Sequence, residues 1–390
     1  MSFTQENLLE AMNTFMMAFQ NLSQEKAELE RLKQEFGVYI AEHFSLTAHA
    51  ARAAQPPVAA LPDTEQIQTQ CQQLIQQAVE NLSANQTPPM PIDTSSHEAE
   101  NIALKAELEK YRHLCGFAPP GHFYSPIPSI ETLTAHLQSL GQQPLPRNLP
   151  GIDLNVDKQL ELLRAFTALT PEICFPLEKT APAHYYYNNH SFQHSDAILM
   201  QCLIRHFRPN RILEVGSGFS SFVTLDTNQQ FFERRIRCEF IEPSPKRLLE
   251  DLTPEELQIT GLYPQKFQDV DLAVFADLNA DDILFLDTSH VCKLNSDVNH
   301  LIFNVLPVLK SGVIIHLHDI FFPFENSPRY YQWPAFWNEC YLLRAFLTHN
   351  TDYQILLWND YLKLFHPTEM GHIHPDCLGN TNQSFWIQKR

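Results

Sequence analysis

The stretch RILEVGSGFSSF, Arg211 to Phe222, decides the fold of this chain. Its apolar first half is typical of a buried β-strand, and Gly216 and Gly218 predict a tight turn before a helix that begins near residue 219. Glycine is scarce here, with 11 in 390 residues, against a usual share of about 7%. Two glycines within three residues therefore indicate that the backbone itself has a task at this turn.

Strands and helices alternate around the turn. Further strands are predicted at 238–243, near 257–262, at 282–287 and 312–319, and in YQILLWN and SFWIQK. Helices are predicted at 130–140, 157–169, from 196, from 219, at 245–251 and at 295–309. This alternation predicts right-handed crossovers and an α/β fold with a doubly wound parallel sheet, which binds ligands beyond the carboxyl ends of its strands.

The chain divides into three predicted regions: a helical extension with proline-rich linkers at 1–115, a connecting segment at 116–183 and the α/β domain at 184–390. The first helix spaces Leu8, Met12, Phe15, Phe19 and Leu22 by alternating steps of four and three. That spacing is typical of a coiled-coil seam and predicts a homo-oligomer. An amphipathic helix packed on its own domain is the alternative.

Composition excludes several classes of partner. The formal net charge of -18 argues against a general nucleic-acid binder, because phosphate neutralisation requires clustered Lys and Arg. No apolar run is long enough to span a membrane, and the N-terminus lacks the basic region of a secretory signal. The eight cysteines are scattered and form no CxxC. A cytoplasmic protein with reduced thiols, and with no membrane or nucleic-acid partner, is expected.

Acidic residues near the turn indicate what it could bind. A dinucleotide fingerprint, GxGxxG, would place a third glycine where this chain has Ser221, which weakens the case for NAD. Glu214, two residues before the first glycine, suits a cofactor with a positively charged amino group, such as S-adenosylmethionine (AdoMet). Glu242 ends the second strand, where an acid can accept both ribose hydroxyls of NAD or AdoMet. Asp269 is either the acceptor for an adenine amino group or a solvated loop acid.

The blocks EVGSGFSS and FIEP resemble motifs of class I AdoMet-dependent methyltransferases. The resemblance extends over roughly residues 117–390 through YYYNNHSFQHSDA, DDILFLDTSHVCKLNSDVNHLIF, GVIIHLHDIFFPFE and WNECYLLRAFL. These blocks resemble a bacterial family related to macrolide-sugar O-methyltransferases.

That resemblance implies a seven-stranded Rossmann-like sheet whose last strand is antiparallel. It also implies that Glu214, Gly216 and Gly218 line the methionine end of AdoMet, with Ser217 and Ser220 of the same turn among the cofactor-binding residues. Glu242 would then hold the ribose, and Asp269 would lie near the adenine.

The fourth and fifth strands end in polar residues. Asp287 ends the fourth, with His290 three residues later, whereas His318 and Asp319 end the fifth. Both strand ends meet at the carboxyl edge, near the expected methyl group. Two mechanisms fit: His290 is a general base, or Asp287 and Asp319 hold a divalent cation such as Mg²⁺. His318, where the family has an acid, would be a third ligand. His316 is expected to be structural.

The sequence thus predicts an AdoMet-dependent methyltransferase with Asp287, His290 and Asp319 as catalytic residues. Its predicted substrate is a hydroxyl of a sugar or a similar small polar metabolite, on the strength of family resemblance. Two alternatives stay open at this point. One is an NAD-dependent enzyme on the same topology, and the other is a non-enzymatic oligomeric scaffold that keeps the fold.

Overall fold

A computed structural model describes residues 118–390 except 141–143, 174, 332–334 and 380–382. All described residues fall within one unit of the chain, Asn101–Arg390. The predicted extension at 1–115, with its coiled-coil seam, lies outside the described residues. The homo-oligomer and the domain boundaries therefore stay predictions.

Seven strands form a sheet in the order β3-β2-β1-β4-β5-β7-β6. Strands β1 to β5 pair in parallel, whereas β7 runs antiparallel to both β5 and β6. In chain order they are β1 (Arg211–Val215), β2 (Arg237–Ile241), β3 (Gly261–Tyr263), β4 (Ile283–Leu286), β5 (Ile314–Leu317), β6 (Tyr353–Trp358) and β7 (Phe385–Lys389). The predicted α/β sheet with seven strands and an antiparallel last strand is confirmed. Strand order reverses between β1 and β4, the switch point at which such sheets bind ligands.

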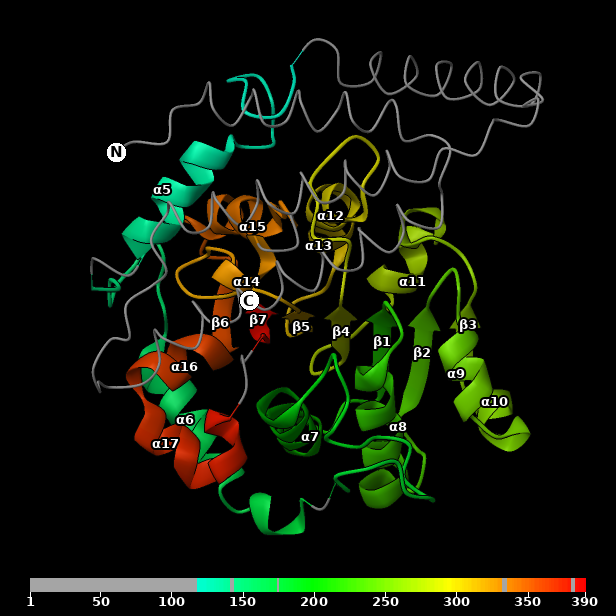
Figure 1. Ribbon diagram of the computed structural model, residues 1–390. Helices are drawn as coiled ribbons and strands as arrows, with labels where there is room; N and C mark the ends of the chain where they lie inside the picture. The colour runs from blue at the N-terminus through cyan, green and yellow to red at the C-terminus, as the bar shows by residue number, and fades with distance from the viewer. Residues whose placement is uncertain (1–117, 141–143, 174, 332–334, 380–382) are drawn as a thin grey trace, which may run out of the picture. The chain divides into compact units, whose positions relative to one another are not determined.

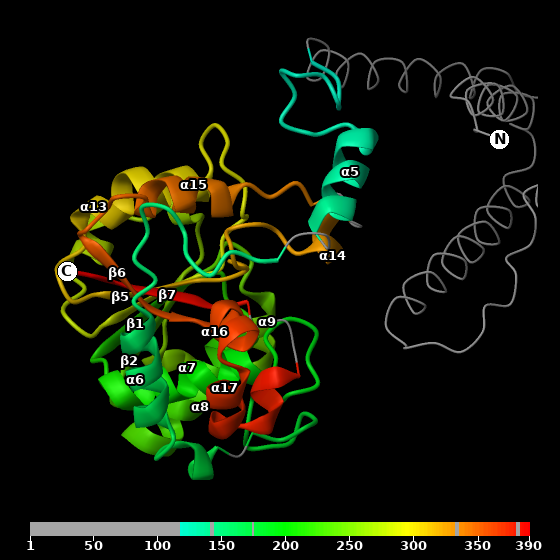
Figure 2. The ribbon, with the colours of Figure 1, turned by 90° about the vertical axis from the view of Figure 1, so that its left-hand side faces the viewer.

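Helices cover both faces of this sheet. In Figures 1 and 2, α13 and α15 lie over one face, and α6, α7 and α8 lie over the other. The α-helices are α5 (Ile130–Leu140), α6 (Val156–Phe166), α7 (His194–Phe207), α8 (Phe219–Phe232), α9 (Lys246–Asp251), α10 (Pro254–Ile259), α11 (Leu272–Ala276), α12 (Asp297–His300), α13 (Leu306–Val308), α14 (Pro328–Tyr331), α15 (Glu339–Leu347), α16 (Asn359–Phe365) and α17 (Pro367–Ile373). Shorter turns are η1 (Thr170–Glu172), η2 (Phe267–Asp269), η3 (Leu301–Val305) and η4 (Pro375–Leu378).

The centre of the sheet is fully enclosed. A row of paired residues crosses it from β1 to β7: Glu214 beside Phe285, Phe285 beside His316, and His316 beside Trp386. All four are buried, as expected of parallel strands covered on both faces. The His316 imidazole stacks on the Phe285 ring with 3.8 Å between ring centres, and burial holds its pKa well below the usual value. His316 is therefore a neutral core residue, in line with its expected structural role.

Two predicted elements differ from the structure. Residues 254–259, assigned in part to the third strand, form helix α10, and β3 is confined to Gly261–Tyr263. The reason is a capping box: the Thr253 hydroxyl accepts from the Glu256 backbone N–H, and the Glu256 carboxylate accepts from the Thr253 N–H. The helix predicted at 295–309 is present as a continuous helical run over 297–308, but it contains a π turn at Leu301–Val305 between α12 and α13. Pro307, which cannot donate a backbone hydrogen bond, lies in the last piece.

Within the described part of the chain, Cys202, Cys238, Cys292, Cys340 and Cys377 are free thiols. No helix within the described ranges is long and apolar enough to cross a membrane.

A histidine fastens the segment before α7 to the α/β core. His184 Nδ1 lies 3.0 Å from an Asp226 carboxylate oxygen of α8, and its Nε2 lies 3.3 Å from a Glu256 oxygen of α10. The backbone N–H groups of His184 and Tyr185 also donate to Asp226. The hydrogen bond to Asp226 raises the pKa of His184, although burial opposes the rise.

We expect this contact to make stability depend on pH. Because the folded pKa lies above the unfolded value of about 6.5, the stabilisation is complete below that pH and is lost as the pH rises through the folded pKa. The unfolding free energy of the wild type should therefore exceed that of His184→Gln most at about pH 6 and least in alkaline buffer, as measured by denaturant titration. A difference that grows with pH would contradict this.

Candidate active site

The glycine turn brings the ends of β1 and β4 into contact. Gly216 has φ +83°, a left-handed conformation that favours glycine. Its N–H donates to the Ile241 carbonyl at 3.0 Å, which continues the β1–β2 ladder. A Cβ on Gly216 would lie 2.4 Å from the backbone carbonyl oxygen of Asp287. Glycine is thus required here by the close approach of the strand that carries Asp287.

Behind the turn, a buried carboxylate holds the first turn of α8. Glu214 is fully buried, and its Oε1 accepts from the Ser220 hydroxyl at 2.6 Å and the Ser221 hydroxyl at 2.9 Å. Ser221 Oγ in turn accepts the Gly218 N–H at 3.0 Å. Burial raises the pKa of Glu214 to about 8, against the opposing effect of the two serines. Glu214 and Ser220 therefore support the turn, and their direct contact with a cofactor stays a prediction.

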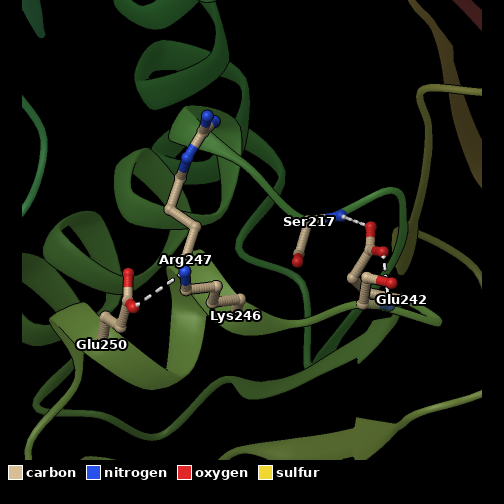
Figure 3. Close-up of a pocket in the computed structure, with 6 residues that line it drawn as sticks. Ser217, Glu242, Lys246, Arg247 and Glu250 are labelled. Atoms are coloured by element: carbon tan, nitrogen blue, oxygen red, sulfur yellow. Dashed lines mark hydrogen bonds and ion pairs between the residues drawn. The ribbon is translucent and has the colours of Figure 1, made fainter. Parts of the chain in front are cut away.

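In front of the turn lies a pocket of about 460 Å³ lined by Ser217, Glu242, Ser244, Lys246, Arg247 and Glu250. Figure 3 shows Glu242 facing Ser217, whose backbone N–H donates to Glu242 Oε2 at 3.2 Å. The Ser244 N–H donates to Glu242 Oε1 at 2.8 Å. Both carboxylate oxygens are thus oriented by backbone N–H groups at the tip of β2. The volume lies within the usual range for small-ligand sites.

Two further residues border this region. The Arg247 guanidinium lies 4.9 Å from the centre of the Phe219 ring, and the Tyr186 ring meets the same phenylalanine edge to face. Gly218, with φ -165°, has open space at its Cβ position, where the nearest atom is Arg247 Nη1 at 3.9 Å. Asp269 is exposed at the end of η2, after β3, and it does not line the pocket at Glu242.

The predicted catalytic residues converge at the ends of β4 and β5. The Nε2 atom of His290 lies 3.3 Å from Asp287 Oδ1 and 3.6 Å from Asp319 Oδ2. Its Nδ1 atom lies 2.9 Å from Glu339 Oε2, on α15. Burial alone would lower the pKa of His290, but the hydrogen bonds to Asp287 and Glu339 raise it well above the usual value. Burial opposes the effect of the histidine on Asp287, whose pKa is nonetheless lowered.

Asp319 and His290 are held in strained backbone conformations. Their φ angles are +57° and +58°, in the left-handed region that costs a residue with a Cβ about 1–2 kcal/mol. The Asp319 side chain is fixed on one side by the Tyr330 hydroxyl, which donates to Oδ1 at 2.7 Å, and by the Gln383 amide. Strain of this kind persists where surrounding contacts impose it, and it clusters at functional sites.

The residues predicted to bind a metal, Asp287, His318 and Asp319, make different contacts in the structure. No group of three His, Cys, Asp or Glu side chains suited to a metal ion occurs among the described residues. The oxygens of Asp319 are directed to Tyr330 and His290. The His318 ring packs against Phe192 with 5.4 Å between ring centres. The Nε2 atom of His290 lies within 3.6 Å of carboxylate oxygens of both Asp287 and Asp319, and a cation at these residues stays a prediction.

Sequence reasoning missed three residues of this centre: Glu339, Tyr330 and Gln383. Each contacts a predicted residue, yet each lies far from it along the chain, and 49 residues separate Glu339 from His290. The only sequence signal for Glu339 was its position in the block WNECYLLRAFL. Tyr330 and Gln383 lie in segments that gave no pattern of their own.

Comparisons with known proteins bear on the same segment. Residues 213–320 match the model of a family described as a methyltransferase domain. This range includes the turn, Glu242, Asp287, His290 and Asp319. A protein of Archaeoglobus fulgidus, described as uncharacterized, is 37% identical over 172 residues, which cover 42% of this chain and 75% of that protein.

Solved structures give weaker likenesses. The Podospora anserina methyltransferase PaMTH1, bound to SAH, is 16% identical, and the match covers 68% of this chain and 99% of that one with a TM-score of 0.33. The O-methyltransferase TomG from Streptomyces achromogenes, in complex with SAM, is 14% identical, with 66% and 96% covered and a TM-score of 0.32. Scores this low support no inference about this chain.

Proposed function

The chain belongs to the family of the Archaeoglobus fulgidus protein and contains a methyltransferase domain, and from this premise we propose that it transfers the methyl group of AdoMet to a hydroxyl of a small polar metabolite. The observation that carries the proposal is that two sites lie along one edge of the sheet. The pocket at Glu242 lies at the end of β2, and the Asp287–His290–Asp319 group lies at the ends of β4 and β5. Gly216 connects them through its contact with Asp287.

The pocket has the chemistry that a nucleoside requires. Glu242 presents a carboxylate, oriented by two backbone N–H groups, to accept the two ribose hydroxyls. The open space at Gly218 leaves room for a ligand to approach the backbone at the start of α8. Asp269, exposed beyond β3, is the proposed partner of the adenine amino group. Ser217 and Gly216 complete the turn around the cofactor.

Methyl transfer is an in-line displacement, so the chain has to position the acceptor oxygen and remove its proton. AdoMet supplies the methyl group from a sulfonium. We assign the proton to Nε2 of His290, which the loop after β4 places between Asp287 and Asp319. Asp287, which is partly exposed, orients the acceptor hydroxyl. Asp319, fixed by Tyr330, stabilises the imidazolium that forms.

Several finer predictions accompany this proposal. A sugar is the proposed acceptor, on the strength of the sequence resemblance. A cation at Asp287, Asp319 and His318 stays a prediction that a chelator assay tests, and no step depends on it. The predicted extension at 1–115 is proposed to assemble the chain into a homo-oligomer. A cytoplasmic location and the absence of nucleic-acid and membrane partners are part of the same proposal.

Calorimetry tests the cofactor directly. We expect the full chain to bind AdoMet, and Glu242→Ala to weaken that binding, because the variant removes a charged acceptor of two ribose hydroxyls. Hydrogen bonds to charged groups contribute about 1.5–3 kcal/mol, so the expected loss of affinity is roughly 10- to 100-fold. Glu255→Ala, which removes an exposed carboxylate of α10 that does not line the pocket, is the matched control. Binding of NAD without AdoMet would sink the proposal, and an unchanged affinity in Glu242→Ala would reject Glu242 as the ribose acceptor.

A further inference from the structure

Residues at the start of α15 contact the loop that carries His290 through hydrogen bonds and an aromatic ring. The backbone N–H groups of Asn338 and Glu339 both donate to the His290 carbonyl oxygen, at 3.0 and 3.1 Å. Asn338 also exchanges side-chain hydrogen bonds with the backbone of Cys292. The ring of Trp337 lies 4.4 Å from the imidazole, centre to centre. Three consecutive residues thus fix both the backbone and one face of His290.

The side chain of Glu339 adds a contact to the ring itself. Its Oε2 atom lies 2.9 Å from His290 Nδ1 and accepts the Thr288 hydroxyl at 2.9 Å. Because an ionised carboxylate can only accept hydrogen bonds, Nδ1 has to carry a hydrogen. The other ring nitrogen, Nε2, is therefore the one presented to Asp287 and Asp319.

A purely structural role accounts poorly for this carboxylate. Glu339 is almost fully buried, and its second oxygen, Oε1, has no hydrogen-bond partner within the described part of the chain. A buried acceptor without a partner is destabilising. Its side chain also makes no capping bond to its own helix, since both of its hydrogen bonds run to the 288–290 loop. The described partners of this buried carboxylate thus all lie in the loop that carries His290.

We propose that Glu339 is a positioning residue for the methyl transfer, one that holds the His290 ring with hydrogen on Nδ1 and Nε2 toward the acceptor. This inference rests on the proposed function for its purpose and on the Glu339–His290 contact for its geometry. A carboxylate that fixes a histidine through one nitrogen while the other nitrogen does chemistry is a recurrent arrangement in catalysis. The carboxylate comes here from α15, which lies between β5 and β6 in the chain.

Nitrogen-15 NMR of the histidine-labelled full chain tests the geometry without any acceptor. We expect the wild type to show, in addition to any signal from the His184–Asp226 contact, a slowly exchanging Nδ1 proton that disappears in His290→Gln. Glu339→Gln should lose or displace it, since a neutral amide can accept from Nδ1 or donate to it. Thr288→Val is the control: it removes the other hydrogen bond to Oε2 and the bond from the His290 backbone N–H to the Thr288 hydroxyl, yet keeps the carboxylate, so the signal should remain. If Glu339→Gln does not fold, Glu339→Asp, which retracts the charge by one methylene, should still weaken the signal.

The rate of methyl transfer tests whether the Glu339–His290 contact serves catalysis. The assay is the transfer of labelled methyl from AdoMet to a pool of low-molecular-mass metabolites, with AdoMet affinity measured alongside. Glu339→Gln should lower the rate roughly 100-fold and leave AdoMet affinity unchanged. In a His290→Gln background the same change should have no further effect, which a structural role would not produce.

The outcomes separate the two proposals. An unaltered Nδ1 signal in Glu339→Gln, or an altered signal with an unchanged rate, would overturn the positioning role. A wild-type chain with the protected Nδ1 proton that neither binds AdoMet nor transfers methyl would overturn the proposed function. In that case the role of Glu339 in methyl transfer would also be rejected, but its contact with the His290 ring would still be supported.

Discussion

Replacing His290 by Gln is expected to lower methyl transfer by about 10²- to 10⁴-fold, the contribution usual for a positioned acid or base. The physical reason is the location of Nε2, within 3.6 Å of carboxylate oxygens of both Asp287 and Asp319. Gln is preferred to Ala because its amide can still donate a hydrogen bond to Glu339, so the buried carboxylate keeps a partner. Rates are measured with labelled AdoMet and the metabolite pool, and AdoMet affinity should not change, since His290 does not line the pocket at Glu242.

His372→Gln is the matched control, because that histidine is exposed on α17.

The pH dependence of turnover is a second test of His290 as the base. A base has to be unprotonated, and the pKa of His290 is raised well above its usual value by Asp287 and Glu339, against burial. Wild-type turnover should therefore climb with pH through a region above about 6.5. A flat profile, or a His290→Gln variant as fast as the control, would refute the role of His290 as base.

Replacing Gly216 by Ala is expected to unfold or severely destabilise the domain. The left-handed φ of +83° costs an L-residue about 1–2 kcal/mol. The new Cβ would also lie 2.4 Å from the Asp287 carbonyl oxygen, a backbone atom that cannot move aside without disturbing β4. Together these effects remove a large share of the roughly 5–15 kcal/mol that stabilises a domain. Denaturant unfolding measures the loss, and a midpoint equal to that of the wild type would show that the turn is not built as described.

Gly218→Ala serves as its counterpart two residues away. There the backbone is extended, and the nearest atom to a new Cβ is 3.9 Å away. The folded chain should keep nearly its full stability, while AdoMet affinity falls because the methyl group occupies space at the cofactor turn. The pair thus separates folding from cofactor binding within a single turn.

The sequence was sufficient for the sheet and for one edge of the site. Apolar runs such as Ile283–Leu286 are nearly continuous because these strands are buried on both faces. Asp287, His290 and Asp319 follow strands directly, so topology alone brings them to one edge. Glu339 could not be found in this way, because its contact with His290 depends on how α15 packs. The contacts of Asp319 with Tyr330 and His290 likewise depend on packing and could not be predicted from residue types. Helix α10 was missed because a local capping box outweighs the strand-like residues around it.

His290 and Asp319 have left-handed backbone conformations, which lower the stability of the folded chain at the two positions proposed to serve methyl transfer. Asn or Gly at either position would relieve the local conformation and remove a functional side chain. Laboratory evolution that rewards only heat resistance would thus be free to change these two residues, whereas evolution that also rewards methyl transfer would have to improve stability elsewhere.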